Sequence, residues 1–291
     1  MISKALATSL TTALGSEVIS SRPLAGGDIC KAYEVTLASR LTLFVKTHAS
    51  APLGLFEAEA KGLAWLAQPK ALRVPYVWAH SHAVAGQTPF LALEYIKPGT
   101  RAKDYAVQLG QGLANLHRAG AEVFGLPYDN YIAVLPQPNA PAVTWLEFYR
   151  EWRLEPMLER AADHGSLPPA LRLKFDQLYA RLPELVGPNE PPSRLHGDLW
   201  SGNAMCDEKG MPCLVDPAVY GGHREMDLAM MQLFGGFERQ CFDAYNESYP
   251  LSEGYKDRVP LYQLYPLLVH LNLFGAGYLG SLERTLDLVL R

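Results

Sequence analysis

Apolar residues recur at every fourth position near the start of the chain, which predicts one face of an amphipathic helix. These residues are Ile2, Leu6, Leu10 and Leu14. The pattern then changes to short alternating or apolar segments that predict strands, and a helical pattern over Phe56–Leu66 lies among them. The strand candidates are residues 29–37, 41–45, Val74–Ala79 and Phe90–Tyr95. The short connection at residues 38–40 predicts an antiparallel hairpin between the first two of them.

From Lys103 onward the apolar spacing is mostly helical. The helix candidates are Asp104–Ala119, Trp145–Ala162 and Leu171–Leu182. By contrast, Arg194–Met205 is loop-like and leads to a short apolar stretch at Cys213–Val215. This order predicts an α+β protein of two lobes. We expect a small antiparallel sheet with one main helix in residues 1–97 and a larger, mostly helical lobe in residues 98–291.

The composition is that of a globular protein and does not by itself indicate a function. The 291 residues carry a net charge of −4, and 48% are hydrophobic, as in ordinary soluble globular proteins. We expect no nucleic-acid partner, because no concentrated basic stripe is present. The apolar stretch Leu261–Leu279 is interrupted by polar residues and a proline, which favours a buried helix pair over a membrane span. Four scattered cysteines without a C-x-x-C pair indicate reduced thiols and a cytoplasmic protein.

The most informative stretch is His196–Asn203, with the sequence HGDLWSGN. It places Asp198 five residues ahead of Asn203 in a glycine-containing loop, and Asp216 follows thirteen residues later. A single loop aspartate is more often a turn or cap residue. Phosphoryl transfer, however, needs oxygen ligands for metal ions and a carboxylate near the attacking hydroxyl. The joint spacing predicts that Asp198 is the base and that Asn203 and Asp216 hold Mg²⁺.

The H-G-D-x-x-x-x-N…D arrangement resembles the aminoglycoside and choline kinase branch of the protein-kinase-like fold. More narrowly, several stretches are similar to the fructosamine kinase (ketosamine kinase) family. They are Phe44–Lys46, Phe56–Leu63, Phe124–Ile132, Arg194–Asn203 and Asp216–Met230. These stretches fall in order across nearly the whole chain. The resemblance implies a two-lobed kinase that uses ATP and Mg²⁺.

The resemblance also implies roles for the first lobe. Lys46 would be the lysine that pairs with the nucleotide phosphates, although a lysine at a strand end is more often simply solvated. Glu59, thirteen residues later, is similar to the glutamate that pairs with this lysine. Glu57 lies about half a helical turn away and should point elsewhere. We therefore expect Glu59, and not Glu57, to position the ammonium group.

Other nucleotide contacts are less specific. The turn Gly26-Gly27-Asp28 would cover the phosphates with backbone N–H groups, although two adjacent glycines most often make a hairpin. Glu94 and Tyr95 fall where the hinge between the lobes would present backbone groups to the adenine. Cys30 stands where the family more often has Asn, and it is either a packed thiol or, if exposed, a redox-sensitive one.

Around the loop, the resemblance makes His196 a brace and gives Asp227 the role of binding the loop backbone. Trp200 either contacts the C–H face of a sugar-like acceptor or wedges the loop into the core. Asp129 and Asn130 match a family stretch, but they receive no role beyond a contact on the substrate side.

The resemblance implies phosphorylation of a ketosamine hydroxyl, a fructosamine or ribulosamine, at O3 of the sugar. The ketosamine is free or linked to a protein, and its phosphorylation leads to deglycation. An aminoglycoside or a choline-like amino alcohol is the alternative acceptor. A polycation is disfavoured because the acidic residues between Glu147 and Asp176 are interspersed with basic ones. A nucleotide-binding pseudokinase scaffold is disfavoured because Lys46, Asp198, Asn203 and Asp216 are all present. The sequence specifies neither the preferred ketosamine nor the oligomeric state.

Overall fold

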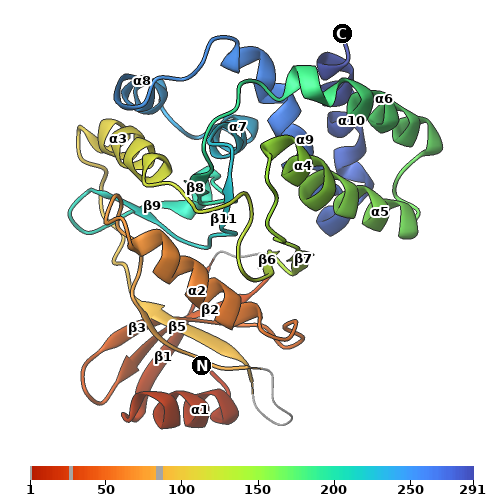
Figure 1. The fold of residues 1–291 in the computed structure, drawn as a ribbon. Helices are drawn as coiled ribbons and strands as arrows, with labels where there is room; N and C mark the ends of the chain where they lie inside the picture. The colour runs from red at the N-terminus through yellow and green to blue at the C-terminus, as the bar shows by residue number, and fades with distance from the viewer. Residues whose placement is uncertain (1, 26–28, 83–87) are drawn as a thin grey trace. The chain divides into compact units, whose positions relative to one another are not determined.

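The computed structural model describes residues 2–25, 29–82 and 88–291. Its contacts divide the chain into two compact units (Figure 1). The first unit is the chain up to Tyr105 together with Met205–Pro217, and the second is Ala106–Ala204 together with Ala218–Arg291. The segment Met205–Pro217 therefore belongs with the first unit, although it comes far later in the sequence.

A five-stranded antiparallel sheet organises the first unit, with the strand order β1-β2-β3-β5-β4. The strands are β1 (Val18–Leu24), β2 (Lys31–Leu37), β3 (Thr42–Thr47), β4 (Val77–His80) and β5 (Phe90–Glu94). The hairpin expected at residues 38–40 joins β2 and β3, and Arg40 has a positive φ of 67° there. The sequence pattern gave no clear signal for β1, because this edge strand contains Pro23 and has no buried residue.

Two helices complete the first unit, α1 (Lys4–Leu14) and α2 (Leu55–Ala67). The Ser3 side chain accepts a hydrogen bond from the Leu6 N–H at the start of α1, and Gly15 ends that helix with a left-handed φ of 66°. Leu6 and Leu10 are buried in a cluster with apolar residues of β2, β3 and β5. Burial of each such leucine contributes about 1.5–3 kcal/mol, so this face fixes α1 against the sheet.

The late segment forms a small hairpin of β9 (Ala204–Cys206) and β10 (Pro212–Leu214). The Asp207 carboxylate accepts hydrogen bonds from the Lys209 and Met211 N–H groups, both at 2.9 Å, which closes the turn. Arg73 holds this hairpin to the first unit, because its guanidinium donates to Asp207 at 2.6 Å and its backbone bridges to Cys213. The hairpin leads directly to Asp216.

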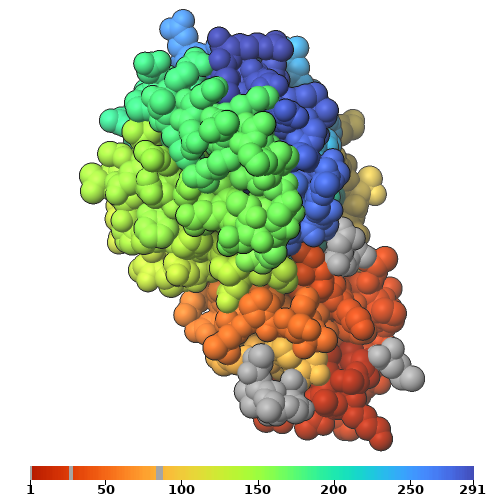
Figure 2. Space-filling model, turned by 90° about the vertical axis from the view of Figure 1, so that its right-hand side faces the viewer, coloured from red at the N-terminus to blue at the C-terminus, as the bar shows by residue number. Residues whose placement is uncertain are grey.

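The second unit is mostly helical. Its helices are α3 (Tyr105–Arg118), α4 (Trp145–Tyr149), α5 (Glu155–Asp163), α6 (Pro169–Leu185), α7 (Glu225–Leu233), α8 (Arg239–Ser248), α9 (Tyr255–Phe274) and α10 (Leu279–Val289). Two short antiparallel pairs join them, β6 (Asn130–Ile132) with β7 (Leu135–Gln137) and β8 (Ser193–Leu195) with β11 (Tyr220–Gly222). Figure 2 shows α6 (green) beside α10 (blue), where Lys174 pairs with Glu283 and Asp287.

The single helix expected at Trp145–Ala162 is interrupted. A π-helical turn at Arg150–Leu154 separates α4 from α5, and it places the Arg153 side chain in the interior with no exposed surface. Such turns insert one extra residue and frequently mark functional sites. Near the other end of the chain, α9 contains Pro260 and Pro266. None of the helices in the described residues is long and apolar enough to cross a membrane.

Candidate active site

In the first unit, three charged side chains meet around Lys46. Its Nζ lies 2.7 Å from Glu59 Oε2 and 3.0 Å from Asp216 Oδ1. Strand β3 positions the lysine between Ala32 of β2 and Leu91 of β5, so only 8% of it is exposed. The ion pair expected between Lys46 and Glu59 is thus present, and it holds the ammonium group in one place.

Burial and the neighbouring charges shift the pKa values of this cluster in opposite directions. Burial alone would lower the pKa of Lys46, but the negative charges of Asp216 and Glu59 outweigh that effect, so the pKa is raised and the lysine stays protonated. For Glu59 the effects are reversed, because burial raises its pKa to about 7 and the charge of Lys46 acts against this shift. Glu57, the alternative partner, instead pairs with Lys61 at 2.8 Å on the outer face of α2.

Asp216 has an unusual backbone. Its φ of 52° lies in the left-handed region, which aspartate tolerates better than most residues. Its side chain is about half exposed, at 47%. Strain of this kind concentrates at functional sites, and here it turns a carboxylate toward solvent at the end of the β9–β10 hairpin.

The other residues predicted to contact the nucleotide also belong to the first unit. The Glu94 carboxylate is engaged by Arg73 at 2.7 Å and by the Tyr76 N–H at 3.2 Å. The Glu94 N–H also donates to the Tyr76 carbonyl at 2.7 Å. The backbone contact of residues 94–95 with adenine stays a prediction. Cys30 is half-buried, and burial raises the pKa of its thiol, which favours the unreactive protonated form. The predicted phosphate loop Gly26-Gly27-Asp28 lies outside the described residues.

In the second unit, the loop after β8 carries Asp198. Gly197 has a φ of 83°, and a side chain there would come within 1.9 Å of the Ala218 carbonyl oxygen, so only glycine fits. The Asn203 Nδ2 donates to the Asp198 carbonyl at 2.8 Å and to its Oδ2 at 3.2 Å. His196 is fully buried, and its Nδ1 accepts the Asp198 N–H at 3.3 Å. The side chains of His196 and Asn203 thus hold the backbone of Asp198.

Asp227 of α7 binds the backbone of this loop. Its carboxylate accepts the N–H groups of His196 at 2.8 Å and Gly197 at 2.9 Å. His117 Nε2 lies 3.1 Å from the same carboxylate, and His117 Nδ1 lies 2.8 Å from the Tyr245 hydroxyl. Burial alone would raise the pKa of Asp227, but these hydrogen bonds and the nearby histidines outweigh it and lower the pKa. Asp227 is therefore a buried anion.

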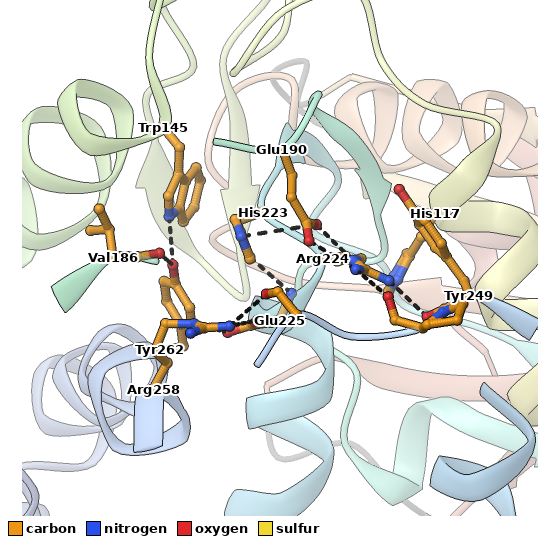
Figure 3. A network of polar contacts seen from close by, with 12 residues as sticks. His117, Trp145, Val186, Glu190, His223, Arg224, Glu225, Tyr249, Arg258 and Tyr262 are labelled. Atoms are coloured by element: carbon orange, nitrogen blue, oxygen red, sulfur yellow. Dashed lines mark hydrogen bonds and ion pairs between the residues drawn. The ribbon is translucent and has the colours of Figure 1, made fainter. Parts of the chain in front are cut away.

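A network at the start of α7 fixes the helix that carries Asp227 (Figure 3). Arg224 makes a two-pronged contact with Glu190, at 2.6 and 2.8 Å. Arg258 makes a second one with Glu225, at 2.9 and 2.6 Å. Such bidentate pairs are geometrically specific as well as strong. These pairs were not predictable from the sequence, because nothing local to any of the four residues indicates its partner.

His223 lies within the same network (Figure 3). Its ring stacks on Tyr262 at 5.4 Å between centroids, and Trp145 Nε1 donates to the Tyr262 hydroxyl at 3.0 Å. Burial lowers the pKa of His223 to about 4, although the Glu190 carboxylate, 4.0 Å from its Nε2, acts in the opposite direction. The ring is therefore neutral at physiological pH.

Below the loop, buried amides connect the β6–β7 pair to residues 218–219. Asn130 Nδ2 donates to the Val219 carbonyl at 2.8 Å, and Gln137 Nε2 donates to Asn130 at 2.8 Å. Asp129 accepts the Asn139 N–H at 2.8 Å, which joins the chain before β6 to the chain after β7. Buried Arg153 donates to the Asn139 side chain at 2.6 Å. Asn130 thus has a scaffolding position, and the family-like stretch around it was the only sequence signal for this network.

Trp200 is on the surface of the second unit, with 42% of it exposed. Its ring covers Gly202, because a side chain at that position would come within 2.2–2.6 Å of the indole. Trp200 is therefore not wedged into the core, and one face of the loop is aromatic.

Comparisons with known proteins agree with this geometry. The family model described as fructosamine kinase matches residues 2–291. The chain belongs to the fructosamine kinase family. A protein of Enterococcus faecium named "Probable ketoamine kinase" is 40% identical over 266 residues, which cover 91% of this chain and 93% of that protein. A crystal structure assigned to fructosamine-3-kinase from Thermobifida fusca has a TM-score of 0.90 and 42% identity over the full length of both chains.

A more distant structure extends the fold assignment. A thermostable mutant of aminoglycoside phosphotransferase APH(4)-Ia, crystallised with AMP-PNP and hygromycin B, has a TM-score of 0.61 at 15% identity. It covers 98% of this chain and 99% of its own. At this identity the likeness concerns the fold alone, which is protein-kinase-like. Membership of the fructosamine kinase family makes this chain an ATP-dependent phosphotransferase.

The donor set predicted for Mg²⁺ fits that ion chemically. Asp216 offers a carboxylate in the first unit and Asn203 a carboxamide oxygen in the second, and Mg²⁺ prefers such oxygen ligands. A carboxamide binds a metal through its oxygen, and the Asn203 Nδ2 already donates to the Asp198 carbonyl. The described residues contain no cluster of three or more His, Cys, Asp or Glu side chains that could hold a metal. Magnesium sites in kinases often use one or two protein oxygens plus phosphate.

Proposed function

We propose that this protein transfers the γ-phosphoryl group of ATP to a hydroxyl of a ketosamine, at O3 of the sugar. The main support is the match to the fructosamine kinase model over residues 2–291, together with a relative named ketoamine kinase at 40% identity. Phosphorylation at O3 would destabilise the adduct and release the amine. The four free cysteines suit the reducing cytoplasm, where we place this activity.

In this proposal Asp198 orients the acceptor hydroxyl and accepts its proton. The geometry supports the role, because Asn203 and His196 hold the Asp198 backbone and Asn203 also contacts its carboxylate. A general base must be held within hydrogen-bonding reach of the proton that it takes. Asp227 acts as a positioning residue, since it binds the loop backbone and not the acceptor.

Lys46 binds the nucleotide phosphates in the same proposal, and Glu59 keeps its ammonium group from turning toward water. Asn203 and Asp216 would hold Mg²⁺, which neutralises charge on the phosphates when bound. The Asp216 contact with Lys46 leaves that carboxylate beside the phosphate-binding cation. His196 supports the loop and takes no proton from substrate.

An aminoglycoside acceptor finds little support in the second unit. Polycations need unpaired carboxylates, but Glu155 pairs with Arg172 at 2.6 Å, and Asp176 lies 3.6 Å from the same arginine. Glu155 of α5 and Asp176 of α6 therefore already share a cationic partner. The test below therefore includes aminoglycosides and choline as competing acceptors.

The test is a substrate panel. Purified protein is incubated with MgATP and ribulosamines, fructosamines, aminoglycosides or choline, and ADP release is measured. The proposal expects turnover of at least one ketosamine, with the phosphate located on O3 by NMR and later release of the free amine. The Asp198→Asn variant is the control for contaminating kinases. Turnover of an aminoglycoside or choline with none on any ketosamine would refute the proposal, as would phosphate at another hydroxyl.

A further inference from the structure

Four aromatic rings form a continuous surface on the second unit, and we call it the aromatic ledge. They are Phe234, His270, Phe274 and Tyr278. His270 is central, with ring centroids 4.7 Å from Phe234, 5.5 Å from Phe274 and 5.0 Å from Tyr278. Phe234 is 40% exposed and Phe274 48% exposed. Adjacent exposed rings of this size commonly mark a binding surface.

The ledge adjoins the hollow beside Asp198. His270 lines that hollow together with Asp198 and several apolar or aromatic residues, among them Tyr220, Met226, Met230, Tyr265 and Val269. The chain that follows Phe234 also approaches the loop, because a side chain on Gly236 would come within 2.6 Å of Ser201. The hollow is small, so an acceptor would place only a hydroxyl-sized group in it and the rest of the acceptor would lie outside, over the ledge.

The charges in the hollow limit what the acceptor can carry. Asp198 is the single carboxylate among the described residues that line it. His270 Nδ1 lies 2.7 Å from the Pro266 carbonyl, so this nitrogen carries the proton and Nε2 carries the lone pair. Burial lowers the pKa of His270, which keeps the ring neutral. A neutral imidazole and aromatic faces suit a single cation that carries an N–H. The π faces attract the cation, and the His270 Nε2 accepts a hydrogen bond from its N–H.

We propose that the aromatic ledge binds the amine end of the acceptor, which comprises one ammonium group and the apolar part of its N-substituent. This inference rests on the proposed function and names the acceptor class more closely. Ketosamines of amines with aromatic or bulky apolar groups are the preferred substrates. Polyamine adducts are disfavoured because a second cation would meet no second carboxylate in the hollow. A quaternary ammonium compound is disfavoured because it has no N–H for His270.

The test uses two fructosamines that differ only in the N-substituent, one made from benzylamine and one from methylamine. Phe274→Ala should raise the KM of the benzyl compound about tenfold, because in this proposal Phe274 contacts the benzyl ring and not the ammonium group, and a ring contact contributes up to about that factor. The KM of the methyl compound, kcat and the KM of ATP should stay within about twofold. Phe274→Trp should restore the benzyl KM. His270→Phe keeps a ring but removes the acceptor, so it should raise the KM of both compounds about fivefold.

Leu288→Ala is the matched control, since Leu288 is also a half-exposed apolar residue near the C-terminus, at 52% exposed, and it should change neither KM. An unchanged benzyl KM in Phe274→Ala, or an equal rise for both compounds, would overturn the inference. Loss of kcat with both KM values unchanged would overturn it as well. If the wild-type protein phosphorylates neither fructosamine nor any other ketosamine, the proposed function fails instead. If it phosphorylates both and the variants behave like wild type, only the ledge is wrong.

Discussion

Replacement of Asp227 by asparagine tests how the loop that carries Asp198 is held. The wild-type carboxylate accepts two backbone N–H groups, from His196 at 2.8 Å and from Gly197 at 2.9 Å. An amide has one accepting oxygen and one donating nitrogen, so in either orientation its NH₂ group faces one of these donors. The substitution therefore removes one hydrogen bond to a charged group and leaves one buried N–H without an acceptor.

The expected cost follows from this lost contact. A hydrogen bond to a charged group contributes about 1.5–3 kcal/mol, and a buried unsatisfied N–H costs about 1–3 kcal/mol. The two ranges describe the same lost contact and do not add, so we expect the free energy of unfolding to fall by about 2–3 kcal/mol, with some relief if the loop shifts. A shift of this kind would also displace Asp198, so kcat should fall by about 10²-fold. The contact between Lys46 and Glu59 lies in the other unit, so nucleotide affinity should change little.

Urea unfolding, steady-state kinetics and fluorescent nucleotide binding measure the three quantities separately. Asp243→Asn is the matched control, because Asp243 makes only a surface i,i+4 pair with Arg239 and its side chain is 56% exposed. Its unfolding free energy should change by less than about 0.5 kcal/mol. The reasoning fails if Asp227→Asn keeps both wild-type stability and wild-type kcat, since the two N–H groups would then have found other acceptors.

Three further predictions concern catalysis, metal binding and pH. Asp198→Asn should lower kcat by about 10²–10⁴-fold and leave ATP affinity intact; an equal loss of affinity, measured by nucleotide titration, would place Asp198 at the metal instead. Asp216→Asn should weaken Mg²⁺-dependent nucleotide binding as well as kcat, and calorimetry with and without Mg²⁺ would expose a binding constant that does not change. His223 has a folded-state pKa of about 4, below its unfolded value of about 6.5. Its contribution to stability is therefore fully present above pH 6.5 and is lost as the pH falls toward 4, by about 2–3 kcal/mol. His223→Gln should remove this part of the pH dependence, and identical denaturation profiles of the two proteins from pH 7.5 to 4.5 would contradict the assignment.

Features encoded within a short stretch were predictable from the sequence. The spacing of His196, Asp198 and Asn203 fixes a loop whose members contact one another, as the structure shows. The resemblance indicated Glu59, and helical phase set Glu57 aside, because residues two apart on a helix face different directions. In both cases the geometry depends on local backbone conformation, which neighbouring residues determine.

Partners distant in the sequence were not predictable in the same way. Arg258 and Glu225 are 33 residues apart, and so many arginines and glutamates alternate along the chain that pattern alone selects no pair. The π-helical turn at Arg150–Leu154 was missed for a related reason. Its apolar spacing is close to that of an α-helix, and the deviation is stabilised by contacts of buried Arg153 with residues such as Pro138 and Asn139. Tertiary contacts, not local propensity, decide such features.

The division of the chain explains why loop and metal residues should respond differently to substitution. Asn203 ends the loop of the second unit, whereas Asp216 follows the β9–β10 hairpin, which packs with the first unit. Within that unit Asp216 contacts Lys46, 170 residues away, and Arg73 holds the hairpin through Asp207. A change at Asp216 therefore perturbs the charge balance of Lys46 even without a metal, whereas a change at Asp198 does not. For this reason the metal dependence of binding, and not the loss of rate, separates the two proposed roles.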